Sequence, residues 1–275
     1  MKDILIAGAG SYIGESFKDF LGQWPDQYTV TDIDTRGLKP EAQMFENMDA
    51  VFCVAGIAHI RGTAENRHLY FDVNRDLVVE IAKVAKTAGV KQFVLLSSMS
   101  VYGLQVGRIT KAMEPHPVTA YGQSKLEADE EIKKLEDENF IFTCLRPPMV
   151  YGKNCAGNYQ VLRKLALKSP VFPNYENQRS MIYIGNLCEF VKDAIDTEKS
   201  GLFFPQNAEY TNTSEMAKQI AAEHGRKIKL TKAFNWAIKI APVNVVKKAF
   251  GSLVYEPIDT VGKYGLKESI RLTEE

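Results

Sequence analysis

Short apolar runs alternate with longer helical patterns along the first half of the chain, and this alternation limits the possible folds more than any other feature. The runs ILIAG, YTVTDID, AVFCVAG, QFVLLSS and FIFTCLRPP have the length and composition of strands. AVFCVAG is almost continuously apolar, as expected of a strand that is buried on both faces. An amphipathic pattern that ends at Gly89 predicts a helix. Strand–helix alternation produces βαβ units, so the sequence predicts an α/β fold with a Rossmann-type doubly wound parallel sheet.

The character of the sequence changes after Pro147. Loops become longer, Pro, Asn and Tyr become more frequent, and the helical patterns become less regular. We therefore expect a domain at 1–150 that contains the sheet. Residues 151–275 should form mainly a small C-terminal lobe, part of which returns to the first domain.

Charge and cysteine content exclude several classes of partner. The 275 residues contain 34 Lys and Arg against 34 Asp and Glu, so no overall field attracts nucleic acid or a membrane surface. No apolar run reaches the length of about 18 residues that a membrane span needs, and Met1–Asp3 is too short for a signal peptide. The four cysteines form no CxxC pair and no metal-like cluster. We interpret them as reduced and buried, which predicts a cytoplasmic protein without a metal site.

The first strand pattern ends in a turn, GAGSYIG, that leads into a helical pattern. In a βαβ unit, glycines at this place let the backbone approach a pyrophosphate, and the N-terminus of the next helix offers free N–H groups. Gly8, Ser11 and Gly14 have this context, although Ile13 stands where a strict GxGxxG has its last glycine. The alternative is a simple strand–helix turn, and we favour the dinucleotide site.

An acidic residue about 20 residues further on would hold the ribose hydroxyls of a dinucleotide. Asp32 and Asp34, at the end of the second strand pattern, both qualify. Arg36 lies just beyond them, where a guanidinium would instead meet the 2′-phosphate of NADP. The sequence therefore leaves NAD and NADP open as cofactors, and NAD is favoured.

A tyrosine and a lysine share one face of a later helical pattern. Tyr121 and Lys125, in YGQSK, stand at i and i+4, and the stretch LLSSMSVYG before them ends a buried strand in hydroxyls. Lowering the pKa of a tyrosine from about 10 to about 7 requires about 4 kcal/mol, which an adjacent ammonium and a positive nicotinamide ring would supply in a dry site. The alternative is an ordinary solvated Tyr–Lys pair. Together with the glycine turn, the pattern favours a catalytic base.

These motifs resemble those of the extended short-chain dehydrogenase/reductases, specifically the NAD-dependent epimerase/dehydratase (nucleotide-sugar epimerase) family. GAGSYIG, AGIAH, VNRD, SSMSVYG, YGQSK, LRPPMVYG and RSMIYIGNL occur in the family's order, over residues 1 to about 190. The resemblance implies that 1–150 is an NAD(P)-binding Rossmann domain and that 151–275 is mainly a substrate-binding lobe. It also implies a nucleotide-diphosphate sugar as the substrate and the possibility of a homodimer that uses the helix beginning near Tyr121.

The resemblance also implies a role for each residue that matches a family motif. Ser98, Tyr121 and Lys125 match the catalytic residues, with Tyr121 as acid/base and Lys125 also on the nicotinamide ribose. Asn74 matches a family asparagine that we interpret as positional, and His59 is a candidate for the edge of the active site. The implied cofactor contacts, in addition to Tyr121 and Lys125, are Gly8, Ser11, Tyr12, Ile13, Gly14, Asp32, Asp34, Arg36, Ala55, Gly56 and Pro148. The implied substrate contacts are Ser98, Ser100, Tyr121, Asn158 and Arg179.

The sequence departs from the family pattern in ways that bear on the fold and the reaction. Only about 15 residues separate Asp34 from the AVFCVAG run, so the third strand of the family sheet should be shortened or lost. Met99 follows Ser98 where a dehydratase carries an Asp–Glu pair, so dehydration is not indicated. Met149 stands where some sugar epimerases carry a substrate-contacting asparagine.

The favoured function is an NAD(P)-dependent epimerase that acts at C4 of a UDP-hexose or UDP-N-acetylhexosamine through a 4-keto intermediate. An NADPH-dependent reductase of a nucleotide-4-keto-sugar is the first alternative. A reductase of small carbonyl compounds and a non-catalytic dinucleotide-binding regulator are further alternatives.

Overall fold

The computed structural model describes residues 1–58, 66–235 and 250–275, and the chain forms two compact units. The first unit comprises 1–103, 114–147 and 188–204, and the second comprises 104–113, 148–187 and 205–275. The chain therefore enters the second unit before residue 150, with the short excursion 104–113, and residues 188–204 belong to the first unit. His59, a candidate from the sequence, lies outside the described residues.

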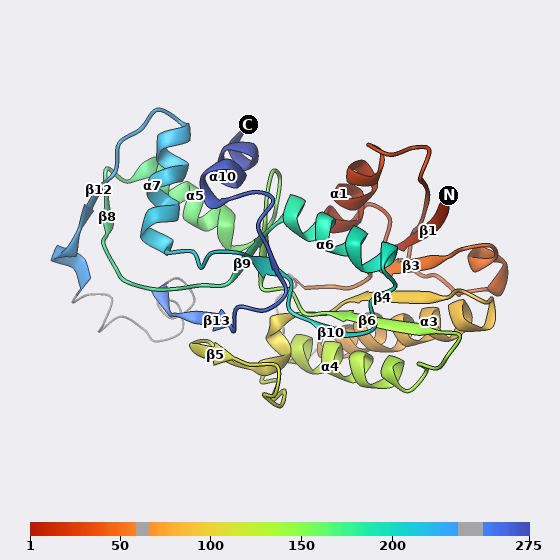
Figure 1. Ribbon diagram of the computed structural model, residues 1–275. Helices are drawn as coiled ribbons and strands as arrows, with labels where there is room; N and C mark the ends of the chain where they lie inside the picture. Colours follow the sequence, from red (N-terminus) through yellow and green to blue (C-terminus); the bar gives the residue numbers. More distant parts are fainter. Residues whose placement is uncertain (59–65, 236–249) are drawn as a thin grey trace. The chain divides into compact units, whose positions relative to one another are not determined.

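The first unit is built on a six-stranded sheet in which every neighbouring pair is parallel (Figure 1). The strand order β10-β6-β4-β3-β1-β2 places β1 between β2, which follows it, and β3, which lies on its other side. This arrangement confirms the doubly wound Rossmann-type sheet. The strands are β1 (Lys2–Ala7), β2 (Tyr28–Ile33), β3 (Ala50–Cys53), β4 (Gln92–Leu96), β6 (Ile141–Leu145) and β10 (Gly201–Phe203).

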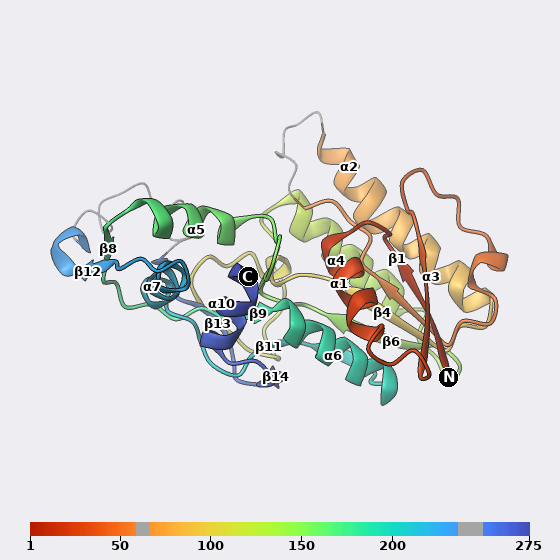
Figure 2. The same ribbon diagram turned by 90° about the horizontal axis from the view of Figure 1, so that it is seen from above.

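Helices cover both faces of this sheet. On one face lie α1 (Tyr12–Leu21) and the part of α6 (Ile184–Asp196) that belongs to this unit; on the other, α3 (Val78–Thr87) and α4 (Ala120–Lys133) run side by side (Figures 1 and 2). The ring of Phe17 on α1 meets that of Phe52 on β3 at 5.1 Å. On the opposite face, α3 and α4 pack on the sheet and form a core in which residues such as Val51 and Ile81 are fully buried. The apolar stripes of the helices therefore explain why the strands read as continuously apolar.

The third strand of the family sheet is absent, as the short spacing predicted. Between β2 and β3 the structure has only a 3₁₀ turn, η1 (Ala42–Phe45), and no strand in the described residues 34–49. As a result β2 forms the edge of the sheet.

The amphipathic helix predicted to end at Gly89 has a less regular beginning than its pattern indicates. It starts as α2 (Arg67–Phe71), continues through a π-helical stretch, η2 (Asp72–Leu77), and then becomes α3. Asn74 lies in the π-helical stretch and is fully buried. Such π-helical bulges often occur at functional sites. Here the bulge carries Asn74, whose side chain forms hydrogen bonds to Ile57 and Ser124.

The second unit consists of short parallel strand pairs and three described helices. α7 (Thr213–Glu223) contacts both α5 (Asn158–Lys168) and α10 (Leu266–Glu274). The excursion at 104–113 supplies β5 (Gly107–Ile109), which pairs with β13 (Leu253–Tyr255). The other pairs join β7 (Met149–Tyr151) to β9 (Met181–Tyr183), β8 (Val171–Pro173) to β12 (Lys229–Thr231), and β11 (Gln206–Asn207) to β14 (Thr260–Val261). Two further 3₁₀ turns are η4 (Lys232–Phe234), in this unit, and η3 (Met99–Tyr102), in the first unit.

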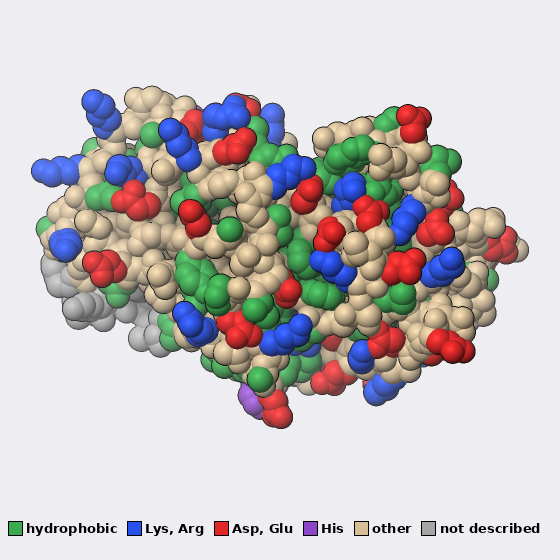
Figure 3. Space-filling model, viewed as in Figure 1, with side chains coloured by type: hydrophobic (Ala, Val, Ile, Leu, Met, Phe, Trp, Pro, Cys, Tyr) green, Lys and Arg blue, Asp and Glu red, His purple; other side chains and the backbone are tan. Residues whose placement is uncertain are grey.

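Acidic and basic side chains are interspersed on the face shown in Figure 3, in keeping with the equal numbers of the two kinds in the sequence. Within 1–58, 66–235 and 250–275, the helices are all too short or too polar to cross a bilayer.

Candidate functional site

The glycine turn lies where the carboxyl ends of β1 and β3 meet, which is the point where the strand order reverses. Gly8 has φ +130°, and a Cβ atom there would stand 2.8 Å from Cγ2 of Val54 and 3.2 Å from the amide nitrogen of Ala55. Only glycine lets the two segments approach this closely. In doubly wound sheets this reversal point is the usual crevice for a dinucleotide, and the turn has the form that such a ligand needs.

The helix after the turn begins with an ordered cap. Ser11 is the N-cap of α1, and its hydroxyl accepts a hydrogen bond from the amide of Gly14 at 3.2 Å. A Cβ atom on Gly14 would be 2.7 Å from that hydroxyl and 3.1 Å from Cγ2 of Ile6, so glycine allows α1 to pack closely on β1. Tyr12 and Ile13 are the first two helical residues, in the turn whose N–H groups face a ligand.

One residue of the turn was not identified from the sequence. Gly10 has φ +73°, and its amide donates to Oε1 of Glu15 at 2.9 Å. Its spacing from Gly8 matches the first two glycines of a GxGxxG pattern, and this spacing could have identified it. Glu15 thus places a carboxylate at the helix end where the pyrophosphate of a dinucleotide is expected.

The acidic residues after the glycine turn lie at the edge strand. Asp32, on β2, pairs with Lys18 on α1 at 2.5 Å. Asp34 follows the strand and holds Arg36 in a two-point pair, with the closest N–O distance 2.6 Å, and the guanidinium lowers the pKa of Asp34 to about 2. Because Lys18 and Arg36 are each paired with a carboxylate, the four charges at this edge balance.

The segment after β3 is held in place by a buried amide. Asn74 accepts a hydrogen bond from the amide of Ile57 at 2.7 Å and donates to the carbonyl of Ile57 at 3.1 Å and to Ser124 Oγ on α4 at 3.2 Å. A Cβ atom on Gly56 would be 3.0 Å from both Asn74 Oδ1 and Lys125 Nζ. The sequence-predicted residues Ala55 and Gly56 are therefore brought directly against the helix that carries Tyr121 and Lys125.

The predicted catalytic serine and tyrosine are brought together by a glycine. Ser98 caps η3, directly after β4, and Tyr121 lies in the first turn of α4. A Cβ atom on Gly122 would be 2.6 Å from the carbonyl oxygen of Ser100, so only glycine allows η3 to pack on the start of α4. Ser98 is half-buried and acts on Tyr121 as a side-chain hydrogen-bond partner, whereas Ser100 is exposed.

Burial raises the pKa of Tyr121 above its ordinary value, and the hydroxyl of Ser98 opposes that rise. The ammonium of Lys125 donates hydrogen bonds to the carbonyl oxygens of Leu96 at 3.0 Å and Ala55 at 3.3 Å. The pKa of Lys125 is itself lowered by burial. That an adjacent ammonium and a positive nicotinamide ring together make the phenol of Tyr121 acidic therefore stays a prediction.

The remaining predicted residues belong to the second unit. Pro148 is its first residue after β6, and Asn158 is the exposed first residue of α5. Arg179 is half-buried, and one guanidinium nitrogen donates to the carbonyl of Gly251 at 2.9 Å. Burial lowers its pKa, and no carboxylate among the described residues forms an ion pair with it.

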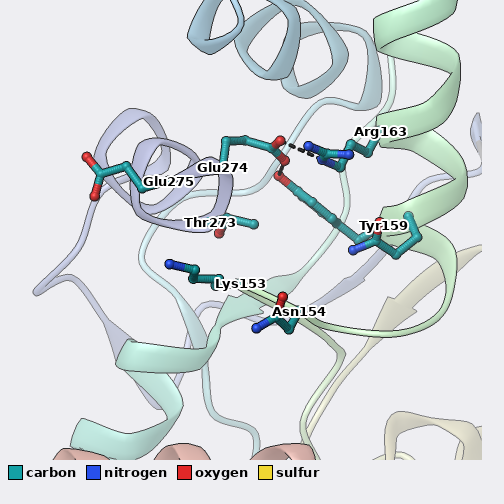
Figure 4. Close-up of a pocket in the computed structure, with 8 residues that line it drawn as sticks. Lys153, Asn154, Tyr159, Arg163, Thr273, Glu274 and Glu275 are labelled. Carbon is teal, nitrogen blue, oxygen red and sulfur yellow. Dashed lines mark hydrogen bonds and ion pairs between the residues drawn. The ribbon is translucent and has the colours of Figure 1, made fainter.

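A separate polar cavity of about 270 Å³ lies within the second unit (Figure 4). Glu274 on α10 accepts hydrogen bonds from Tyr159 at 2.7 Å and from Arg163 at 2.6 Å, and it lies 2.6 Å from Nε2 of His224. These bonds outweigh burial and hold the pKa of Glu274 below its ordinary value. None of the five predicted substrate contacts lines the cavity, whose described lining is Lys153, Asn154, Tyr159, Gln160, Arg163, Thr273, Glu274 and Glu275.

Comparisons with known proteins give one family and several relatives. A family model described as the NAD dependent epimerase/dehydratase family matches residues 4–203. The chain is 28% identical over 246 residues to a UDP-glucose 4-epimerase of Vibrio cholerae, over 80% of this chain and 75% of that protein. It is also 28% identical over 217 residues to an N-acetyl-alpha-D-glucosaminyl-diphospho-ditrans,octacis-undecaprenol 4-epimerase of Escherichia coli O157:H7. This match covers 72% of this chain and 65% of that protein, so the chain spans slightly less than two thirds of that relative's length.

Solved structures share the fold at low identity. The UDP-glucuronic acid 4-epimerase of Bacillus cereus in complex with NAD superposes with a TM-score of 0.77 at 16% identity, over 99% of this chain and 97% of that one. The dTDP-4-dehydrorhamnose reductase of Bacillus anthracis str. Ames in complex with NADP gives 0.76 at 16% identity, over 99% and 98%. At such identities the similarity shows a common fold.

Proposed function

The chain belongs to the NAD dependent epimerase/dehydratase family, and from this premise we propose that it is an NAD-dependent epimerase acting at C4 of a nucleotide-diphosphate sugar. Membership confirms the resemblance predicted from the motifs. The curated relatives, which include a UDP-glucose 4-epimerase, support C4 as the reacting carbon.

The observation that carries the proposal is the meeting of Ser98 and Tyr121 at the carboxyl end of β4. Lys125, one turn further along α4, reaches the carbonyl of Ala55 at the dinucleotide crevice. A phenol, a hydroxyl and an ammonium thus converge beside the place where the glycine turn would hold the pyrophosphate.

The side chains define the proton-transfer steps. NAD, when bound, supplies the hydride acceptor and donor and a positive ring that favours the phenolate of Tyr121. Tyr121 then removes the proton of the C4 hydroxyl as the C–H bond is broken, leaving a 4-keto sugar, and returns the proton to the same oxygen when the opposite face is reduced. Ser98 donates a hydrogen bond to that oxygen and positions it. Lys125 orders the crevice through its two carbonyl contacts.

The second unit offers groups for the diphosphate of the substrate. Arg179 is a half-buried guanidinium without a carboxylate partner among the described residues, and such a group recognises phosphate oxygens in a two-point manner. Asn158, exposed at the beginning of α5, adds a polar side chain at a helix N-terminus. We propose these two residues as diphosphate ligands. Arg179→Gln should abolish stabilisation of the protein by UDP while leaving stabilisation by NAD unchanged.

Purified protein should be incubated with a panel of UDP-hexoses, UDP-N-acetylhexosamines and a polyprenyl-diphosphate N-acetylhexosamine, without any reductant. Formation of the C4 epimer supports the proposal and identifies the carrier of the sugar. Tyr121→Phe should remove turnover. Tyr28→Phe, which loses a hydroxyl bonded to Asp196 elsewhere in the same unit, should retain it.

Other results would favour the alternatives. Loss of a 4-keto sugar that depends on added NADPH, with no epimer formed from any sugar, would make the protein a reductase. Binding of NAD without turnover of any substrate would point to a regulator, provided that Tyr121→Phe still produces the same response in a partner protein.

We also infer that the protein works in the cytoplasm as a homodimer. Cys53, Cys144, Cys155 and Cys188 are all buried and unlinked, which suits a reducing compartment. The helix that begins near Tyr121 is the proposed dimer surface, and light scattering of the purified protein would test this by giving the mass of two chains.

A further inference from the structure

The buried stripe of α4 continues beyond the two family residues. Asp129 stands four residues after Lys125 and eight after Tyr121, so all three lie on one helical face. Its side chain is only 5% exposed and accepts hydrogen bonds from Arg146 Nε at 2.9 Å and from Ser97 Oγ at 2.8 Å. An acidic group therefore lies inside the unit, directly behind the proposed catalytic pair.

Each partner of Asp129 comes from an element that ends at the site. Ser97 immediately precedes Ser98, and Arg146 immediately follows β6. Another nitrogen of Arg146 donates to the hydroxyl of Tyr102, in η3, at 2.8 Å, and its guanidinium lies 5.3 Å from the centre of that ring. The pair thus joins α4, the end of β4, η3 and the end of β6.

Such a network is poorly explained by stability alone. The side chain of Arg146 is only 8% exposed, so both charges have lost most of their hydration. Well-packed apolar residues are often as stable as a buried ion pair in such a place. The geometry points instead to a use that requires the charges and their directional bonds.

We propose that Asp129 and Arg146 are positioning residues, which hold the strand end carrying Ser98 against the helix carrying Tyr121 and Lys125, and that the Asp129 carboxylate balances the cations beside it. The catalytic roles of the three held residues rest on the proposed function, but the geometric statement does not.

The charged and titratable groups around the site fix the expected sign. Tyr121 is faced by Tyr70 from α2 and by Asp129, and both raise its pKa. Lys125 is faced by Cys53 from β3, Cys144 from β6 and Asp129. Removing the carboxylate while Arg146 keeps its charge should therefore lower the pKa of Tyr121.

The size of this change follows from the helix geometry. Eight residues of helix span about 12 Å, and one charge at that distance moves a pKa by about one pH unit at an effective dielectric constant of about 20. Asp129→Asn is the variant that removes the charge and keeps the shape of the side chain.

The decisive measurement is a tyrosinate titration by ultraviolet absorbance with NAD present, in wild type and in Asp129→Asn. The same titration in a Tyr121→Phe background is subtracted to isolate this phenol. The midpoint should fall by about one pH unit in Asp129→Asn, and the acid side of the kcat profile should move with it. Asp129→Glu should restore the wild-type midpoint, and Ser97→Ala, which removes a bond but no charge, should leave it unchanged.

The double variant Asp129→Asn with Arg146→Met guards against a single variant that does not fold, since it leaves no unpaired charge. Its midpoint should stay near that of wild type, while its kcat should fall by about tenfold or more because Ser98 is no longer held. A folded Asp129→Asn with an unchanged midpoint refutes the charge role, and a double variant with wild-type kcat refutes the positioning role. Because the titration needs no turnover, an inactive wild type would count against the proposed function only.

Discussion

Replacing Asn74 by alanine should loosen the segment that follows β3 and weaken cofactor binding. The side chain makes three hydrogen bonds, two to the backbone of Ile57 and one to Ser124. Each contributes about 1 kcal/mol net, and the Ile57 groups, which are half-buried, can be partly rehydrated. We expect the free energy of unfolding to fall by about 2 kcal/mol. The affinity for NAD should fall by about tenfold, since binding would then have to order the segment itself.

Urea unfolding and a calorimetric NAD titration would measure the two effects of Asn74→Ala. Ser124→Ala is the matched control, because it removes only one of the three bonds of Asn74, although it also loses the bond from its hydroxyl to the carbonyl of Tyr121. The control loses two hydrogen bonds, so its free energy of unfolding should fall by a similar amount, about 2 kcal/mol, but it should bind NAD nearly as wild type does because both bonds to Ile57 remain. If Asn74→Ala binds NAD with wild-type affinity, or if Ser124→Ala weakens NAD binding as much, the positional role derived for Asn74 is wrong.

Gly8→Ala should destabilise the protein by about 2–4 kcal/mol through its positive φ and its contact with Val54. Gly10→Ala, which meets no neighbouring atom, should cost only about 1 kcal/mol in the same denaturant titration, and equal losses would contradict the proposed close approach. Glu15→Gln keeps an acceptor for the Gly10 amide but removes a charge from the helix N-terminus, so NAD should bind about three- to tenfold more tightly; weaker binding would show that the carboxylate does not oppose the pyrophosphate. Glu274→Gln should lower the free energy of unfolding by about 2 kcal/mol at pH 7. Because the folded pKa of Glu274 lies below that of the unfolded chain, its stabilisation is complete above the unfolded pKa of about 4.3 and is lost as the pH falls through the folded pKa, so thermal unfolding of variant and wild type should converge in acid.

The sheet could be predicted from the sequence because its signals are local. The almost continuously apolar composition of a run such as AVFCVAG indicates a strand that is buried on both faces. The helical patterns between such runs then favour parallel strands joined by crossover helices. The loss of a strand between Asp34 and Ala50 was equally readable, since so few residues cannot hold a strand and a crossover helix. The excursion at 104–113 was not readable, because β5 pairs with β13, which lies far along the chain.

The helical stripe of Tyr121 and Lys125 was readable from its spacing, but the electrostatics of Tyr121 were not. An i, i+4 spacing places two side chains on one face, yet it does not say where a long flexible side chain ends. The ammonium of Lys125 donates to the carbonyl oxygens of Leu96, at the end of β4, and of Ala55, in the segment after β3, and burial is the largest influence on the pKa of the phenol. Both carbonyls become neighbours only when the sheet forms.

Asp129, like the electrostatics of Tyr121, could not be predicted from the sequence because its surroundings form only in the packed unit. In the sequence it is one of several acidic residues in LEADEEIKKLEDE, a run that looks like a solvated helical face. Its neighbour Glu130 is indeed exposed, whereas Asp129 turns inward to Arg146, which is seventeen positions away in the chain and on another element. Charge alone could not separate the two, because only the packing of α4 on the ends of β4 and β6 decides which carboxylate loses its water. Burial raises the pKa of Asp129, and Arg146 and Ser97 oppose that rise, so the position of the carboxyl group behind Tyr121 follows from the same contacts that bring Ser98 to the site.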